Sequence, residues 1–332
     1  MEVLVTGGCG YIGSHTCVEL LQRGYKVVII DNLSNSKEEV ISKIEKITNK
    51  KVKFYKGNVQ NKSLLRKIFK ENNISMVIHF AGFKAVGESV SKPLMYYKNN
   101  LFSTINLCEV MKEFNVKNLV FSSSATVYGD AKVIPITEES QLSTTNPYGS
   151  TKLYIEGILK DLYISDNSWN IVLLRYFNPI GAHESGLIGE DPNGIPNNLM
   201  PYIVKVATKE LDHLNVFGND YDTVDGTGVR DYIHVIDLAI GHVKSIEKLT
   251  KDKGFFVYNL GTGKGYSVLQ VVNTFMKVNN VEVKYEIAPR RSGDIAVCYA
   301  DTTKAKKELG FTATKTLEDM CRDAYNYRVK NK

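Results

Sequence analysis

The chain has 332 residues, a length that predicts about two domains of ordinary size. Apolar residues make up 43% of it and charged residues 23%, which is close to the globular average and excludes a disordered or fibrous chain. The formal net charge of +6 comes from basic residues spread along the chain, so it gives no reason to expect a nucleic-acid partner.

The first half of the chain alternates short apolar segments with longer amphipathic ones. The apolar segments show little polar alternation, which favours strands buried on both faces, at residues 3–6, 27–31, 52–55, 76–80, 119–122 and 171–175. The amphipathic segments predict helices at residues 12–23, 37–48, 62–72, 94–114 and 148–165. Repeated strand–helix–strand order predicts an α/β fold with a doubly wound, Rossmann-type parallel sheet.

This rhythm changes after residue 178. Residues 179–200 are rich in proline and glycine and predict a long ordered loop, which in a compact domain is usually functional. Helices are expected at residues 199–209, 235–249, 268–278 and 316–327, with short strands between them. We therefore expect a Rossmann domain over 1–178 and a smaller mixed α/β domain over 179–332, with segments near 232–262 able to pack back onto the first domain.

The five cysteines are odd in number and widely spaced, without a Cys-x-x-Cys motif or a Cys/His cluster. We therefore expect neither a disulfide framework nor a metal site, and a reducing compartment fits. The N-terminus lacks the basic and apolar regions of a signal peptide, and no apolar run approaches the 18 residues of a membrane span. These features predict a cytoplasmic protein with no membrane association.

A glycine-rich turn lies between the first predicted strand and the first predicted helix, with the sequence Thr6-Gly7-Gly8-Cys9-Gly10-Tyr11-Ile12-Gly13. Glycines at this place let backbone N–H groups approach a pyrophosphate at the helix N-terminus. Two registers fit a dinucleotide motif, one starting at Gly7 and one at Gly8. Asp31 ends the second strand, where a carboxylate can bind ribose hydroxyls and repel a 2′-phosphate, so NAD is favoured over NADP. The alternative for Asp31 is a turn-forming aspartate.

Two Tyr-x-x-x-Lys pairs occur, Tyr148 with Lys152 and Tyr128 with Lys132. About two such pairs are expected by chance in a chain of this composition, so the spacing alone does not show which pair is functional. Tyr148 follows an Asn-Pro helix start, whereas glycine and proline around the other pair indicate a loop. A free tyrosine has a pKa near 10, and a lysine ammonium together with a nicotinamide cation would lower that value. The phenolate could then accept a proton from a sugar hydroxyl while a hydride leaves the same carbon.

Polar residues elsewhere suggest substrate contacts. Ser124 follows the fifth strand, at the sheet edge where ligands bind, and its hydroxyl could relay the substrate proton or merely end the strand. Arg230 and Arg291 lie in the second half, and arginine binds phosphate bidentately, so they could hold a diphosphate or form surface ion pairs.

Beyond these motifs, the chain resembles the UDP-glucose 4-epimerase family of extended short-chain dehydrogenases/reductases essentially end to end. The segments that carry the resemblance are residues 3–15, 79–89, 122–129, 174–179, 197–202, 228–234 and 290–294. The resemblance implies an isomerase of galactose metabolism with tightly bound NAD. Tyr148, aided by Ser124, would take the proton of the sugar 4-hydroxyl while hydride passes from C4 to NAD. The 4-keto sugar would turn about its diphosphate and regain hydride on the other face, and Lys152 would hold the nicotinamide ribose and tune Tyr148.

The resemblance also implies a set of ligand contacts and a homodimer formed by residues 94–114 and 148–165. The implied NAD contacts are Gly7, Gly10, Tyr11, Ile12, Gly13, Asp31, Asn32, Leu33, Asn35, Ser36, Asn58, Val59, Phe80, Ala81, Gly82, Lys84, Asn99, Ser122, Tyr148, Lys152 and Phe177. The implied UDP-sugar contacts are Lys84, Ser124, Tyr148, Asn178, Asn198, Leu199, Asn215, Val216, Phe217, Arg230, Arg291, Asp294 and Cys298.

Two positions depart from the family pattern. Many relatives have aspartate in place of Asn58 at the adenine site, and an amide oxygen can still accept the adenine hydrogen bond. Relatives restricted to unsubstituted sugars have tyrosine in place of Cys298, and those that accept N-acetylated sugars have a small residue. Cysteine is small, so we expect room for UDP-N-acetylglucosamine and UDP-N-acetylgalactosamine unless the neighbouring Tyr299 turns in.

Three alternatives remain open. A nucleotide-sugar 4,6-dehydratase or a decarboxylase would keep the family and change the reaction, but acidic residues expected after the fifth strand of a dehydratase are missing from Ser124-Ala125-Thr126-Val127-Tyr128. A non-catalytic nucleotide-binding protein would be expected to lack the tyrosine or the lysine of the pair.

Overall fold

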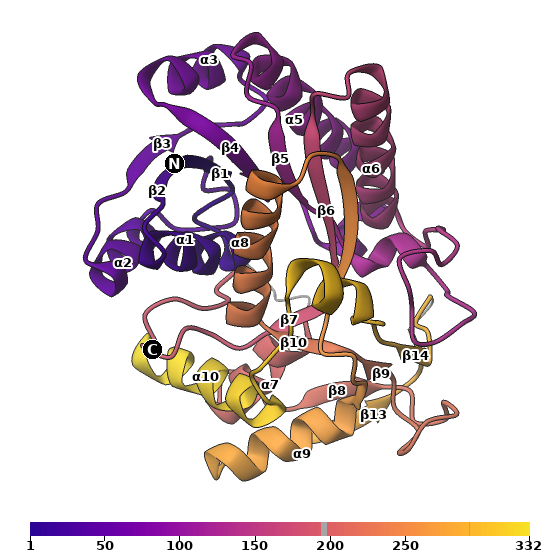
Figure 1. Ribbon diagram of the computed structural model, residues 1–332. Helices are drawn as coiled ribbons and strands as arrows, with labels where there is room; N and C mark the ends of the chain where they lie inside the picture. The colour runs from indigo at the N-terminus through magenta and orange to yellow at the C-terminus, as the bar shows by residue number, and fades with distance from the viewer. Residues whose placement is uncertain (194–197, 292) are drawn as a thin grey trace.

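The computed structural model describes residues 1–193, 198–291 and 293–332, and its centre is a seven-stranded sheet (Figure 1). The strand order is β11-β6-β5-β4-β1-β2-β3, and all neighbouring strands are parallel. The bounds are β1 (Glu2–Thr6), β2 (Lys26–Asp31), β3 (Lys53–Lys56), β4 (Ile74–His79), β5 (Asn118–Ser122), β6 (Asn170–Tyr176) and β11 (Phe255–Leu260). This sheet confirms the predicted Rossmann-type α/β fold.

Helices cover both faces of the sheet because its buried residues alternate between the two sides. Val3 and Val5 face one apolar core, and Leu4 between them faces the other. The first face is covered by α1 (Tyr11–Gln22), α2 (Glu39–Thr48) and α8 (Val235–Lys251). The second is covered by α3 (Lys62–Glu71), α5 (Pro93–Glu113) and α6 (Pro147–Ser165).

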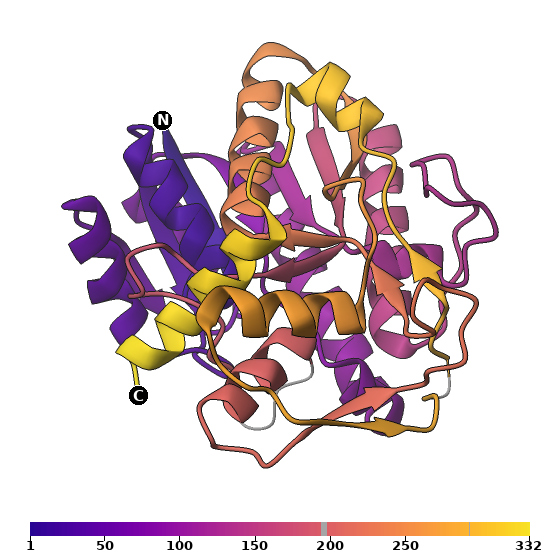
Figure 2. The same ribbon diagram turned by 90° about the horizontal axis from the view of Figure 1, so that it is seen from below.

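The second lobe has its own core and only short strands (Figure 2). Its helices are α7 (Leu199–Ala207), α9 (Val268–Asn279) and α10 (Leu317–Lys330). Its strand pairs are β7 (Asn178–Ile180) with β10 (Tyr232–His234) and β8 (Leu214–Phe217) with β13 (Tyr285–Ala288), and its three-stranded sheet contains β12 (Tyr266–Ser267), β9 (Val229–Arg230) and β14 (Val297–Cys298). Smaller elements are α4 (Val86–Ser91), a 3₁₀ turn at Ala125–Tyr128 and a π-helical turn at Ala305–Leu309.

The chain returns from the second lobe to the first. Helix α8 lies against α1, and β11 adds the seventh strand beside β6. The boundary at residue 178 stays a prediction. Within the expected loop at residues 179–200, the described part contains the end of β7 and the start of α7, while residues 194–197 lie outside the described part, as does Ser292.

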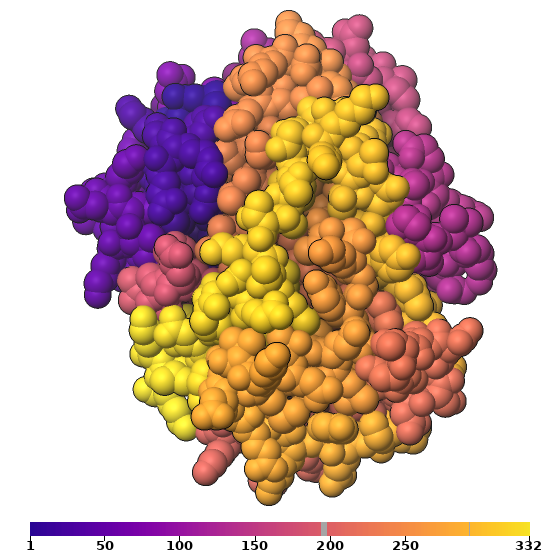
Figure 3. Space-filling view, turned by 60° about the horizontal axis from the view of Figure 1, so that its bottom comes forward, coloured from indigo at the N-terminus to yellow at the C-terminus, as the bar shows by residue number. Residues whose placement is uncertain are grey.

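The order of the strands in the sheet indicates where a ligand cleft should lie. The chain crosses to opposite sides of the sheet after β1 and after β4, and ligands of such sheets bind beyond the carboxyl ends of the strands at this point. In Figure 3 a segment of the second lobe lies between the indigo N-terminal residues and the yellow C-terminal helix. An ion pair between Lys37 and Asp191, at 2.5 Å, joins the first lobe to the segment between β7 and α7. Among the described residues, no helix combines the length and the apolar character that a membrane crossing requires.

Candidate active site

The glycine turn forms the floor of the cleft, because its backbone packs too closely for side chains. A Cβ at Gly13 would lie 2.3 Å from the Gly7 carbonyl oxygen, and one at Gly7, whose φ is +71°, would lie 2.9 Å from the Ala81 nitrogen. Gly7, Gly10 and Gly13 line the cleft, whereas a Cβ at Gly8 would meet the Ile29 side chain at 2.8 Å. Of the two registers open in the sequence, the one starting at Gly7 therefore faces the cleft.

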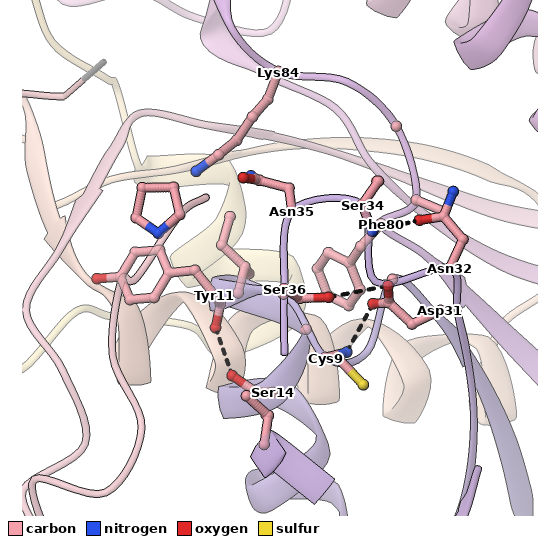
Figure 4. A pocket seen from close by; sticks show the side chains of 18 of the residues that line it. Cys9, Tyr11, Ser14, Asp31, Asn32, Ser34, Asn35, Ser36, Phe80 and Lys84 are labelled. Atoms are coloured by element: carbon pink, nitrogen blue, oxygen red, sulfur yellow. Dashed lines mark hydrogen bonds between the residues drawn. The ribbon is translucent and has the colours of Figure 1, made fainter. Parts of the chain in front are cut away.

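Asp31 fixes the loops around this floor (Figure 4). Its Oδ2 accepts the Cys9 N–H at 3.0 Å, and its Oδ1 accepts the Leu33 N–H at 2.8 Å and the Ser36 hydroxyl at 3.1 Å. The Asp31 carboxylate thus stabilises a turn, which was the alternative role that the sequence left open for this residue. Oδ1 already accepts two hydrogen bonds, but Oδ2 accepts only one and keeps lone-pair capacity for a ribose hydroxyl, so the turn does not exclude a ligand contact.

Tyr148 and Lys152 lie one turn apart on α6 and both line the cleft. The helix starts with Pro147, and the Asn146 side chain caps it by accepting the Gly149 N–H at 2.9 Å. The Lys152 ammonium donates to the Ser122 carbonyl at 2.7 Å, so β5 fixes its position.

The other pair is arranged differently. The Tyr128 hydroxyl donates to Asn259 at 2.7 Å in the core, while Lys132 is exposed and forms an ion pair with Asp130. The two side chains of this pair do not share a site.

Burial governs the proton affinity of the Tyr148–Lys152 pair. Burial raises the pKa of Tyr148 well above its usual value, the nearby Tyr176 raises it further, and a hydrogen bond with Ser124 lowers it. Burial lowers the pKa of Lys152 to about 8, and the charge of Glu156 opposes this shift. The sequence argument expected Lys152 and a nicotinamide cation together to lower the pKa of Tyr148, whereas burial raises this pKa and Lys152 is not among the groups that shift it.

Most of the expected NAD contacts are brought together in one cleft. Those that line it are Gly7, Gly10, Tyr11, Ile12, Gly13, Asp31, Asn32, Asn35, Ser36, Asn58, Val59, Phe80, Ala81, Gly82, Lys84, Asn99, Tyr148 and Lys152. Three do not line it: Leu33, Ser122 and Phe177. Their side chains are partly or fully buried in the surrounding core.

The cleft also has walls that the motifs did not predict. Tyr176 from β6, residues 187–192 and Tyr327 from α10 all line it. The only sequence signal for residues 187–192 was the proline- and glycine-rich loop, and Tyr327 carried no signal.

Of the expected UDP-sugar contacts, only Lys84 and Tyr148 line the cleft, and several of the others contact one another. Arg291 pairs with Asp294 at 2.9 Å, and its guanidinium lies over the Phe217 ring at 4.8 Å. Arg230 and Cys298 are paired across the β9–β14 ladder. Asn198, before α7, reaches the cleft wall through Glu190, to which its amide donates at 2.8 Å. The remaining expected contacts are Asn178 on β7, Leu199 on α7, Asn215 and Val216 on β8, Ser124 at the 3₁₀ turn, and Lys84 and Tyr148 in the cleft.

The residues present fit a dinucleotide. The glycine floor leaves room for a backbone-bound pyrophosphate at the start of α1, and Asp31 ends β2 where an adenosine ribose would lie.

Comparison with known proteins agrees with this geometry. A family model described as GDP-mannose 4,6 dehydratase matches residues 4–324. A UDP-glucose 4-epimerase of Bacillus subtilis is 59% identical over 331 residues, covering 100% of this chain and 98% of that protein. The crystal structure of UDP-glucose 4-epimerase from Bifidobacterium longum in complex with NAD+ and UDP has a TM-score of 0.96 and 58% identity, covering 100% of this chain and 99% of that one. Another from Stenotrophomonas maltophila, with bound NAD and formylated UDP-arabinopyranose, has a TM-score of 0.98 and 47% identity, covering 100% and 98%. With such identity over its whole length, the chain belongs to the UDP-glucose 4-epimerase family of isomerases.

Proposed function

We propose that the protein interconverts UDP-glucose and UDP-galactose by reversible 4-epimerisation through a 4-keto sugar. The observation that carries this proposal is the buried Tyr148–Lys152 pair, which lines the same cleft as the glycine turn. When bound, NAD would supply the hydride acceptor and donor, and its nicotinamide charge would favour the Tyr148 phenolate.

The chain's own residues account for the proton and for the orientation of the sugar. Tyr148 accepts the 4-hydroxyl proton, and the Ser124 hydroxyl, which lies near enough to lower the pKa of Tyr148, orients that group. Lys152, held by the Ser122 carbonyl, keeps a positive charge beside the site. The Ala125–Tyr128 turn contains no acidic residue, which argues against the dehydratase alternative.

Proton NMR of the purified protein with UDP-galactose and UDP-N-acetylgalactosamine, and without added cofactor, tests this reaction because the anomeric signals resolve all four sugars. We expect both substrates to convert. Tyr148→Phe should lower the rate by about 10²–10⁴-fold because it removes the proton acceptor. Near-native activity in this variant would refute the assignment of the base.

The same experiment tests the proposed activity on N-acetylated sugars. Cys298 packs in a cluster with Ala125 and Phe177 beside the Ser124 turn, and the Tyr299 ring lies toward Gly265, where a Cβ would meet it at 3.3 Å. We propose that the sugar lies beside this turn, where the side chain that borders it is a small one. Cys298→Tyr should abolish conversion of the N-acetylated sugar and spare UDP-galactose, with Cys298→Ser as the matched small control. Equal loss of both substrates would contradict the steric argument.

We further propose a homodimer through α5 and α6. Apolar side chains are exposed on these helices, with Leu94 81%, Phe102 48% and Ile164 68% accessible. Light scattering should give twice the chain mass, and Phe102→Glu should shift it toward the monomer. A native monomer would refute this proposal.

A cytoplasmic location and a division into an NAD-binding domain over 1–178 and a UDP-sugar-binding domain over 179–332 also remain proposals. The five free cysteines support a reducing compartment.

A further inference from the structure

One acidic side chain in the cleft wall is not explained by the proposed reaction. Glu190 lies in the segment between β7 and α7, and it lines the cleft. Its Oε1 accepts two hydrogen bonds, one from the Lys84 ammonium at 3.1 Å and one from the Asn198 amide at 2.8 Å. A single oxygen thus joins a residue of the sheet domain to a residue of the second lobe.

Two features of the surroundings distinguish these hydrogen bonds of Glu190 from ordinary surface contacts. Its side chain is only 9% exposed, and its Oε1 lies 3.1 Å from the Lys84 ammonium. Asn198 occupies the N-cap position of α7, where an asparagine side chain ordinarily accepts a backbone N–H of the helix. Here it makes no such bond, and its amide donates to Glu190 instead.

We propose that Glu190 is a positioning residue that couples the two ligand sites, by holding Lys84 on the cofactor side and Asn198 on the nucleotide-sugar side. The inference rests on the proposed function and on the contacts that the family resemblance implies, which are NAD and the UDP-sugar for Lys84 and the UDP-sugar for Asn198; of these two residues, only Lys84 lines the cofactor cleft. A ligand that fixes one partner of the shared oxygen reduces the freedom of the other. Occupancy of the UDP site therefore retains NAD, and by linkage NAD strengthens UDP binding.

Removal of the Glu190 carboxylate separates this proposal from a purely electrostatic effect, because the two predict opposite changes in ligand affinity. A negative charge beside anionic diphosphates repels them, so its loss alone would tighten the binding of both ligands. Coupling through hydrogen bonds predicts weaker UDP binding and loss of the mutual effect. The two explanations are therefore distinguishable in sign.

The test measures how fast bound NAD exchanges with labelled NAD, with and without saturating UDP, and measures UDP affinity by calorimetry. The holoenzyme is compared with Glu190→Leu, which removes both hydrogen bonds, and with Glu190→Gln, which keeps an acceptor oxygen without the charge. Glu184→Leu and Glu184→Gln are matched controls, because Glu184 is exposed in the same segment and does not line the cleft.

In the native holoenzyme we expect UDP to slow NAD exchange by about fivefold or more. In Glu190→Leu this ratio should fall below about twofold and UDP affinity should drop, with Glu190→Gln intermediate and both controls native. If Glu190→Leu does not fold, the smaller ratio in Glu190→Gln decides the question. An unchanged ratio, tighter UDP binding, or no effect of UDP on the native chain would overturn the inference. Neither readout needs turnover, so failure of epimerisation in the NMR experiment would remain a separate result.

Discussion

The buried ion pair between β6 and α6 tests what holds the catalytic helix on the sheet. The Arg175 guanidinium donates to both Glu156 carboxylate oxygens, with Nη2 2.6 Å from Oε2 and Nε 3.1 Å from Oε1, and both side chains are 5% exposed. Ser123 donates to the same carboxylate at 2.5 Å. Glu156 follows Lys152 by one helical turn, so the pair lies directly behind the candidate active site.

Removing one partner should be costly because it leaves the other charge buried. We expect Glu156→Leu to lower the free energy of unfolding by about 3–5 kcal/mol. A chain of this length gains about 0.7 kcal/mol/K of entropy on unfolding, so the melting temperature should fall by about 4–7 °C. The double variant Glu156→Leu/Arg175→Met should recover to within about 1 kcal/mol of native, since neither charge remains in the core.

Thermal unfolding followed by circular dichroism, at one fixed NAD concentration, measures these differences. Glu113→Leu is the control, because Glu113 pairs with Arg66 at 2.7 Å on the surface, where solvent screens the pair, so its loss should lower the melting temperature far less than Glu156→Leu does. A double variant that melts as low as Glu156→Leu would show that lost packing, and not an unpaired charge, causes the effect. An equal loss in the surface control would also refute the reasoning.

Two further predictions concern the glycine turn and acid stability. Gly13→Ala should abolish retention of NAD, read from the nucleotide released by denaturation, because its Cβ would lie 2.3 Å from a carbonyl oxygen of the same turn; Gly157→Ala, with nothing within 4 Å of its Cβ, should retain it. Burial lowers the pKa of His15 and His79 to about 3 and that of His242 to about 4. The unfolded chain therefore binds more protons below pH 6.5, and these three histidines should contribute a fall in the free energy of unfolding of about 4 kcal/mol per pH unit between about pH 6 and 4. Urea titrations at several pH values measure this slope, and His242→Phe should remove about a third of it; an unchanged slope would contradict the pKa argument.

Much of the fold could be predicted from the sequence because strands buried on both faces are apolar along most of their length. This holds for β1 and β2, whose residues past the first are all buried. The edge strand β11 was not predicted as part of the sheet. Its first three residues are only partly buried, and it lies far along the chain from β6, its neighbour. Local patterns carry no information about such a long-range pairing.

The residues of the candidate site likewise divide into those that local motifs predict and those that depend on the whole fold. The glycine turn and the Tyr148–Lys152 pair are local motifs, and the helix start before Tyr148 was enough to distinguish the two tyrosine–lysine pairs. Glu190 could not be predicted, because it is one of several acids in an irregular segment and Lys84, its partner, lies 106 residues earlier. The pKa of Tyr148 could not be predicted either, since it depends on burial, which is a property of the whole fold.

The return of the chain to the first lobe limits how this protein can be re-engineered. After β10 the chain contributes α8 and β11 to the sheet layers, and Ala305, Leu309 and Phe311 later join the same core. A second lobe taken from another protein could therefore not be grafted as one contiguous cassette. A chimera would have to replace at least three separate stretches, around 177–234, 261–304 and 312–332, and rebuild their junctions with the sheet. Evolution faces the same constraint, so new substrate preferences in this architecture are more accessible through side chains lining the cleft than through exchange of the lobe.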